Sequence, residues 1–326
     1  MPSGGGRPAS PRYPHLTAAQ GGCNGLQVQT HYHLFQTKAG KLLRRADNQL
    51  IRSPFPVRDD AMQLNKILIV IDPTTDQQPA FERGLDSARD TGALLHLYAC
   101  VNEQSGYASI EEAQQKFQPI LDDLASRVQS EGFESTSELE WAPDWAMRAV
   151  SAATRCAATM IFKNSFDHSP VQRELRPTSD WTLLRMASCP VLMVKNFQDW
   201  QHRRVLAAIN PASTEAAHIK LNQQIISLAQ QLAGSYGSDA HFVTAFQDLN
   251  HAPDSHKIAQ DCAVPPEQVH LKKGKAAEVI REVAAQLDVD LIIVGTVKRD
   301  GIKGRVVGNT CERLLDQTQS DLLVLN

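Results

Sequence analysis

The segment best suited to chemistry is a glycine-rich, basic stretch near the end of the chain. It spans residues 295–310 (GTVKRDGIKGRVVGNT) and intersperses four glycines with four basic residues: Gly295, Gly301, Gly304 and Gly308, with Lys298, Arg299, Lys303 and Arg305. Glycines let backbone N–H groups approach an anion closely, and basic side chains neutralise its charge. The stretch fits either a phosphate-binding loop or a solvated connection between a strand and a helix, and it matches neither the Walker A nor the dinucleotide-binding motif.

The residues around this stretch predict the elements that would position it. The apolar run 291–294 is typical of a buried strand, and Asn309 followed by Glu312 predicts a capped helix start. A helix N-terminus beside a glycine-rich loop favours phosphate. In open parallel sheets, ligands bind beyond the carboxyl ends of strands where the strand order reverses. The candidate ligand-binding residues are therefore Asn210, Gly295, Lys298, Gly308, Asn309 and Thr310.

Strand-like and helix-like segments alternate from residue 65 onwards. Continuous apolar runs such as 66–71 predict buried strands, and amphipathic stretches such as 111–129 predict helices. This alternation favours a parallel sheet with helices on both faces. The expected strands of the first unit are 66–71, 94–101, 138–141, 158–163 and 190–194, and the expected helices are 79–91, 111–129, 144–154 and 180–186.

The same order of predicted strands and helices occurs twice. Ile71-Asp72-Pro73 is matched by Ile209-Asn210-Pro211, and the terminal helix and strand around 180–194 are matched at 311–325. The chain is therefore expected to be an α/β protein with two tandem, doubly wound, five-stranded parallel sheets of the flavodoxin-like kind. We expect domains at 62–196 and 203–326, with the strands 190–194 and 322–325 near their interface.

The corresponding loop of the first domain, from Lys163 to Thr178, contains no glycine. Side chains along this loop should keep phosphates away from the backbone, and Pro177 has no N–H to donate. Asp72, Lys163 and Thr178 are therefore interpreted as the remains of a degenerate site.

Other motifs give no indication of catalysis or of metal binding. There is no G-x-S-x-G elbow, no H-E-x-x-H helix and no paired-carboxylate motif, and Asp72 has no nucleophile or histidine beside it in sequence. His96, His241 and His270 occur at isolated positions and are interpreted as half-buried structural histidines. The six cysteines are widely spaced, as in a reducing compartment. We expect no catalytic residue, no metal site and no enzymatic activity.

Composition and charge exclude several classes of function. A formal net charge of −3 gives no overall attraction to nucleic acid, and no apolar run is long enough to cross a bilayer. Residues 1–61 are rich in Gly, Pro and Ser and then mixed polar, which predicts a flexible extension, and Met62 could instead be the true start. The chain is expected to be cytoplasmic, without a membrane span or a direct nucleic-acid partner.

The paired motifs resemble the universal stress protein family. Val70-Ile-Asp-Pro73, Pro177 to Arg185, Pro190 to Lys195 and Gly295-Thr-Val297 are similar to its tandem-domain E subfamily, over roughly residues 62–326. ATP-binding members carry G-x2-G-x9-G-[ST] and an Asp after the first strand. Here Lys298 and Asn309 replace the middle glycine and the Ser or Thr, and Asn210 replaces the Asp. The resemblance implies ATP as one candidate ligand, and no cofactor is assigned.

The resemblance further implies a protein that supports survival under stress, including resistance to DNA damage. Single-domain relatives dimerise through their last strands, so a tandem chain is expected to form this pair internally, as a pseudo-dimer. Three functions remain open: a regulatory module that binds a small molecule or protein partner, a weak nucleotide hydrolase, and a scaffold with no ligand.

Overall fold

The computed structural model describes residues 64–165, 179–195, 200, 204–296 and 309–326. The expected N-terminal extension and the two long loops before α6 and α10 therefore lie outside the described residues, together with Lys298, Gly308 and Thr178. Within the described ranges, no helix is both long enough and apolar enough to cross a membrane.

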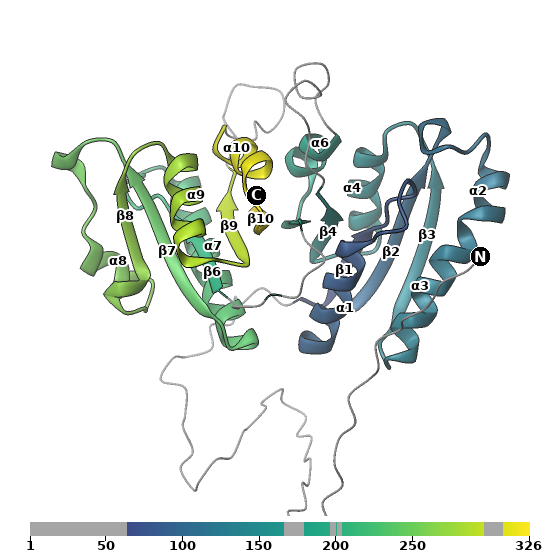
Figure 1. Ribbon diagram of the computed structural model, residues 1–326, viewed down its shortest axis with the longest axis horizontal. Helices are drawn as coiled ribbons and strands as arrows, with labels where there is room; N and C mark the ends of the chain where they lie inside the picture. The colour runs from purple at the N-terminus through teal and green to yellow at the C-terminus, as the bar shows by residue number, and fades with distance from the viewer. Residues whose placement is uncertain (1–63, 166–178, 196–199, 201–203, 297–308) are drawn as a thin grey trace, which may run out of the picture. The chain divides into compact units, whose positions relative to one another are not determined.

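The first half of the chain alternates strands and helices in the expected order (Figure 1). Its strands pair in parallel in the spatial order β3-β2-β1-β4-β5, so the order reverses between β1 and β4. The elements are β1 (Lys66–Val70), α1 (Pro79–Thr91), β2 (Leu94–Val101), α2 (Ile110–Lys116), α3 (Gln118–Ser130), β3 (Ser135–Trp141), α4 (Trp145–Arg155), β4 (Met160–Asn164), α6 (Ser179–Met186) and β5 (Val191–Val194).

The second half repeats this arrangement. Its parallel strands take the order β10-β9-β6-β7-β8, with the reversal between β6 and β9. The elements are β6 (Arg204–Ala208), α7 (Ala216–Tyr236), β7 (Asp239–Phe246), α8 (Ser255–Asp261), β8 (Val269–Lys273), α9 (Ala276–Leu287), β9 (Leu291–Gly295), α10 (Asn309–Gln317) and β10 (Asp321–Leu325). The predicted class of two tandem, doubly wound α/β domains is confirmed.

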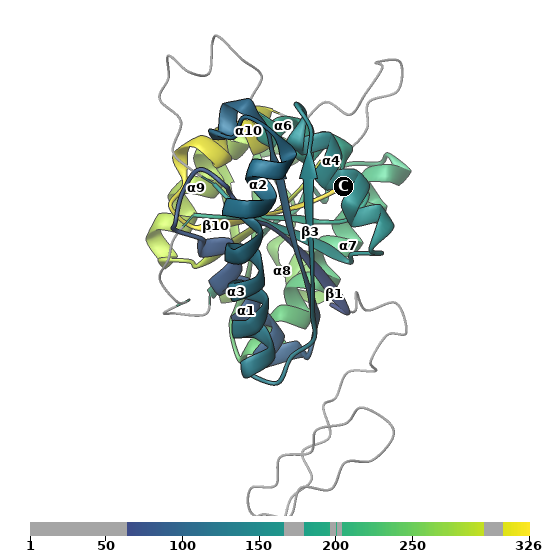
Figure 2. The same cartoon turned by 90° about the vertical axis from the view of Figure 1, so that its right-hand side faces the viewer.

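Helices cover both faces of the sheet because strand residues alternate between two buried apolar clusters. Ile67, Ile69 and Ile71 of the first strand region belong to the cluster that α1, α2, α3, α7 and α8 cover. Leu68 and Val70 belong to the cluster on the opposite face, beneath α4, α6, α9 and α10. Figure 2 looks onto the β3 edge, with α2 and α3 nearest the viewer.

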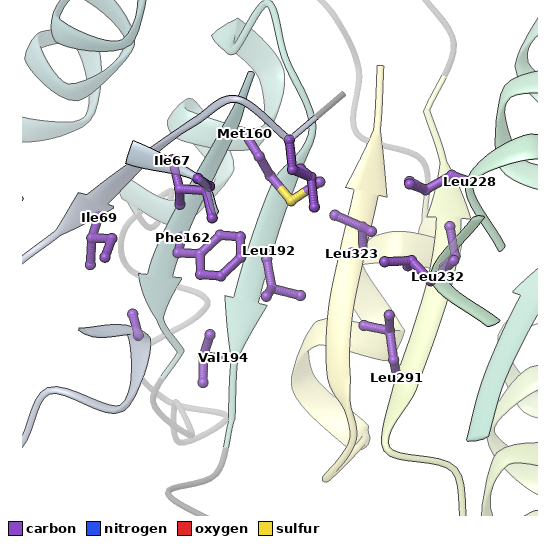
Figure 3. Packing of buried hydrophobic residues seen from close by; sticks show 14 of the residues in the cluster. Ile67, Ile69, Met160, Phe162, Leu192, Val194, Leu228, Leu232, Leu291 and Leu323 are labelled. Atoms are coloured by element: carbon purple, nitrogen blue, oxygen red, sulfur yellow. The ribbon is translucent and has the colours of Figure 1, made fainter. Parts of the chain in front are cut away.

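The two halves share one ten-stranded sheet. The last strands of the halves, β5 and β10, pair antiparallel, with Leu323 opposite Leu192. Apolar side chains continue across this junction, from Phe162 and Leu192 to Leu323 and Leu291 (Figure 3). The pairing removes one exposed edge from each half.

A buried carboxylate ties Trp200 to this junction. Asp321 Oδ2 accepts hydrogen bonds from Arg83 Nε at 3.1 Å and Trp200 Nε1 at 2.9 Å, and its Oδ1 accepts one from the Lys195 N–H at 2.8 Å. Burial raises the pKa of the Asp321 carboxyl, although the Arg83 guanidinium acts in the opposite direction. The contacts join helix α1, the end of β5 and the start of β10.

One local expectation was wrong, and one helix was not expected. The predicted helix 111–129 is divided at Phe117 into α2 and α3, because Pro119 has no N–H and its ring clashes with the preceding turn of a continuous helix. Near the start of α3 the same proline is tolerated, since the first turn leaves its N–H groups unpaired. The helix α8 was not predicted at all.

Candidate ligand-binding site

Two equivalent places qualify as ligand sites by topology, one in each half. They lie at the carboxyl ends of β1 and β4 in the first half and of β6 and β9 in the second, where the strand order reverses. Asp72 follows β1 in the same way as Asn210 follows β6: the preceding Ile71 and Ile209 both donate their N–H groups to the neighbouring strand. The predicted equivalence of Asp72 and Asn210 therefore agrees with the register.

The strand register corrects one residue of the sequence alignment. Asn164 is paired with Val194, and Gly295 with Leu325, while the next residues, Ser165 and Thr296, donate their N–H groups to Val194 and Leu325 at 2.7 and 2.8 Å. Asn164, rather than Lys163, is thus the counterpart of Gly295. Lys163 corresponds to Val294 and faces the opposite side of the sheet. The spacing already contained this signal, because Asn164 precedes Pro177 by the same distance that separates Gly295 from Gly308.

In the first half, an ion pair occupies the end of β4. The Lys163 ammonium lies 3.0 Å from Asp180 Oδ1, and only 8% of Lys163 and 4% of Asp180 is exposed. The same ammonium donates to the Asn164 carbonyl at 2.6 Å and lies 5.1 Å from the centre of the Trp145 ring. The three side chains come from β4, α4 and α6 and converge at the predicted site. We call Trp145, Lys163 and Asp180 the first-half triad.

The Asn164 side chain also serves the fold. Its Oδ1 accepts the Ala80 N–H at 2.7 Å, which satisfies an N–H group in the first turn of α1 that Gln78, at the cap position, does not reach with its side chain. Its Nδ2 donates to Gln78 Oε1 at 3.3 Å, and the Gln78 amide in turn holds the backbone N–H and carbonyl of Asp72. The amide of Asn164 is therefore committed to the start of α1.

Asp72 is used in a local turn. Its Oδ1 accepts the Thr74 N–H at 2.9 Å and the Thr74 hydroxyl at 2.5 Å. This arrangement is typical of an Asx turn. At the first-half site, Asp72 thus binds Thr74, and Lys163 binds Asp180 and the Asn164 carbonyl.

The second half presents smaller, uncharged side chains at the corresponding positions. Gly295 lies against Leu221 of α7 so closely that a Cβ there would be 2.4 Å from Leu221 Cδ2. The Cys311 thiol lies 3.7 Å from the Gly295 carbonyl, and burial raises its pKa to about 12. Cys311 is therefore a neutral packing group at neutral pH.

The first-half triad has apolar or small counterparts throughout. Trp145 and Ala276 each begin their helix, α4 and α9. Asp180 and Cys311 each precede a pair of buried leucines by three residues, Leu183-Leu184 and Leu314-Leu315. With Val294 in place of Lys163, the second-half counterparts are Ala276, Val294 and Cys311, which we call the second-half set.

Of the other predicted second-half residues, the structure describes three. Asn210 is exposed, and the Asn222 amide of α7 binds its N–H and carbonyl at 3.1 and 2.8 Å. Asn309 is the first residue of α10 rather than the residue before it, and Thr310 is half-buried in the same turn. Asn210 follows β6, and Thr310 and Cys311 lie in the first turn of α10. The contact of Cys311 with Gly295 brings this turn against the end of β9.

Sequence reasoning missed the residues that decide the difference between the halves. Trp145 and Leu221 lie in no motif, the stretch Pro177 to Arg185 around Asp180 does not predict its ion pair, and only the fold brings the three residues to the strand ends. In the described part of the chain, no cluster of three or more His, Cys, Asp or Glu side chains is arranged to hold a metal ion.

Comparison with known proteins agrees with the duplicated fold. The universal stress protein family profile matches residues 63–195 and again 203–326. The chain belongs to the universal stress protein family. It is 26% identical to the Universal stress protein E homolog of Haemophilus influenzae, over 80% of this chain and 97% of the relative, and 26% identical to Universal stress protein E of Escherichia coli K12, over 79% and 93%.

Solved structures of similar architecture cover both halves of this universal stress protein. A Pseudomonas aeruginosa PAO1 protein of unknown function superposes with a TM-score of 0.68 at 29% identity, covering 81% of this chain and 94% of that one. A universal stress protein from Archaeoglobus fulgidus superposes with a TM-score of 0.65 at 16% identity, covering 81% and 97%. The second likeness concerns the fold alone.

Proposed function

We propose that this universal stress protein is a non-catalytic binding module whose second half takes a small anionic ligand at the carboxyl ends of β6 and β9. The observation that carries the proposal is the exchange of the first-half triad for the second-half set at equivalent positions. Trp145, Lys163 and Asp180 fill the first-half position with a ring and a buried ion pair. Ala276, Val294 and Cys311 leave the second-half position without any of these groups.

The second-half set lacks the charged groups of the first-half triad, and this difference indicates how a ligand would be held there. A buried charge requires a partner, and the first half supplies both charges from its own chain. In the second half, the stretch 295–310 that follows β9 in the sequence contains four cationic residues, Lys298, Arg299, Lys303 and Arg305. A ligand that brings the negative charge would complete this set. Gly295 and Gly308 would allow its phosphate or carboxylate to approach the backbone.

In this proposal the first half contributes to the pairing of the two halves rather than to ligand binding. Its site is occupied by its own side chains, and β5 pairs with β10, which supports an internal pseudo-dimer of domains 62–196 and 203–326. We place this module in the cytoplasm, where binding of the ligand or of a protein partner would regulate survival under stress, including DNA damage. ATP is one ligand to test, since Lys298, Asn309 and Asn210 depart from the family's ATP-binding pattern.

Native mass spectrometry of the purified full chain tests this function. A retained small molecule at one per chain, absent from a Gly308→Val variant, would support binding in the second half. A protein that never carries a ligand, and to which no small anion binds, would favour the scaffold instead. Release of phosphate from added ATP at a rate that Gly308→Val abolishes would contradict the non-catalytic proposal and favour the hydrolase.

A further inference from the structure

Two histidines that are far apart in the sequence meet on the edge of the second half. His241 Nδ1 of β7 lies 3.1 Å from His270 Nε2 of β8, and the ring centres are 5.3 Å apart with an angle of 33° between the ring planes. Both are half-buried, as expected, but the sequence did not predict that they would meet. The pair lies away from the site proposed above, since β7 and β8 are the outer strands of this half.

The parallel register accounts for the contact. His270 is paired with Val243, and His241 precedes Val243 by two residues, so both imidazoles are on one face of the sheet. Ala240 and Phe242 beside His241 belong to the cluster on the other face. The histidines therefore share the face that α9 covers, at its outer margin, where both are half-buried.

The cationic side chains near this pair are bound to other groups. Arg204 and Lys272 are the positive neighbours, but Arg204 donates to the Leu287 carbonyl at 2.6 Å, and Lys272 binds Glu282 at 2.7 Å and Gln286 at 3.0 Å. Asp239, two residues before His241, supplies a negative charge. Burial lowers the pKa of both imidazoles, which favours their neutral, metal-binding form.

We propose that His241 and His270 form a two-histidine site for a divalent transition metal of the class that prefers imidazole, namely zinc, nickel or copper. Nitrogens bound to one such ion at about 2.0–2.1 Å lie about 2.8–3.4 Å apart for square-planar to tetrahedral angles. The observed 3.1 Å falls within this interval. Since no third His, Cys, Asp or Glu is gathered there in the described part of the chain, water completes the coordination.

The first half provides an internal comparison for this site. His96 occupies the position of His241, because each is paired with the equivalent leucine of the first strand, Leu68 or Leu206. His96 meets Thr136 at 2.7 Å and Glu138 at 3.4 Å rather than a second imidazole. The first half thus has one imidazole where the second has two, and it should not bind the metal.

Footprinting of the unmodified full chain tests the proposal without a variant. Diethyl pyrocarbonate would be applied with and without Zn²⁺, and the modification of each histidine would be read by mass spectrometry. Zn²⁺ should protect His241 and His270 together, at concentrations that leave the exposed His256 reactive. Equal protection of all histidines, or none at His241 and His270, would overturn the proposal.

Single substitutions provide an independent measurement. His241→Gln and His270→Gln should each weaken Zn²⁺ binding at this site by at least about tenfold in calorimetry, because each removes one of two ligands. His96→Gln is the matched control and should retain the affinity. Similar Zn²⁺ affinity in all four proteins would place the metal elsewhere, for instance on the other histidines of the chain.

Discussion

The ends of β4 and β9 show how two copies of one fold can diverge without any change in the backbone plan. Both strands are paired in the same register with their neighbours, and both precede a helix through a connection of similar length, residues 165–178 after β4 and 296–308 after β9. The first copy closes this position with a lysine, an aspartate and a tryptophan, while the second retains glycine, valine and cysteine. The comparison indicates that side chains which satisfy one another can fill a strand end that the same fold leaves to smaller residues in its other copy.

The helices packed beneath these strand ends show a complementary exchange. In the first half Gly84 of α1 lies against Ile69, and Asn164 reaches from the strand to the helix. In the second half Gly295 leaves room for Leu221 of α7, and the neighbouring Asn222 reaches the backbone of Asn210. In both halves, a glycine on a helix or strand leaves space that a side chain from the facing strand or helix fills, as close packing requires.

The largest effect should come from breaking the first-half ion pair. Asp180→Ala leaves the Lys163 ammonium buried without this partner, which should lower the free energy of unfolding by about 3–5 kcal/mol. The double variant Lys163→Val/Asp180→Cys imports the second-half residues and should cost clearly less, because no charge is left buried. Urea denaturation measures both. A double variant as unstable as Asp180→Ala would show that the pair is not the reason for the loss.

The reverse exchange in the second half should have a smaller effect. Gly295→Asn introduces the first-half residue, and its Cβ would overlap the Leu221 side chain. We expect a loss of about 1–3 kcal/mol of stability from overpacking, measured by the same method. Leu221→Ala in the same chain should recover part of the loss caused by Gly295→Asn. If Leu221→Ala only adds to the loss, the close approach is not its cause.

Removal of the Asn164 amide should be milder still. Asn164→Ala deprives the Ala80 N–H of its acceptor at the start of α1, which should cost about 0.5–2 kcal/mol. Asn210→Ala, at an exposed position of the second half, is the control and should be close to neutral. Equal stability of the wild type and Asn164→Ala in thermal melts would show that the Asn164 amide does not stabilise the start of α1.

The smallest expected effect is on the loss of stability at acidic pH. Burial lowers the pKa of His96 below its ordinary value of 6.5, although Glu138 acts in the opposite direction. The unfolded chain then binds a proton more readily than the folded chain, so stability is complete above the ordinary pKa and falls as the pH drops through it. His96→Gln should reduce this acid sensitivity, while His256→Gln, at an exposed position, should not. Identical pH profiles of stability for the wild type and His96→Gln would contradict the assignment.

Periodicity in the sequence predicted most of the fold because it reflects burial directly. The apolar runs at Ile67 and Ile292, and the repeated dipeptides after the first strand of each half, were sufficient for the tandem α/β class. Pro119 was overlooked as a helix break although its chemistry was visible in the sequence. Periodicity does not predict which side chains meet at the end of a strand.

The candidate site was predicted only in part for that reason. The topology predicts it at the strand ends. Asp180 and Trp145 reach Lys163 from helices that follow and precede it in the sequence, and their local sequence does not predict these contacts. The His241–His270 pair was missed in the same way, because a parallel register joins residues from separate strands. Contacts of this kind depend on the tertiary arrangement rather than on any motif.

The most direct test of the asymmetry is a calorimetric titration of the full chain with ATP and, in parallel, with inorganic pyrophosphate. We expect one of these anions to bind at one per chain, and Gly308→Val to abolish the binding by placing a branched side chain beside the helix start. Pro177→Gly, the matched change in the first half, should leave the affinity nearly unchanged. Binding that survives Gly308→Val but is lost in a first-half variant, or the failure of both anions to bind the wild type, would contradict the claim that the second half holds an anion site.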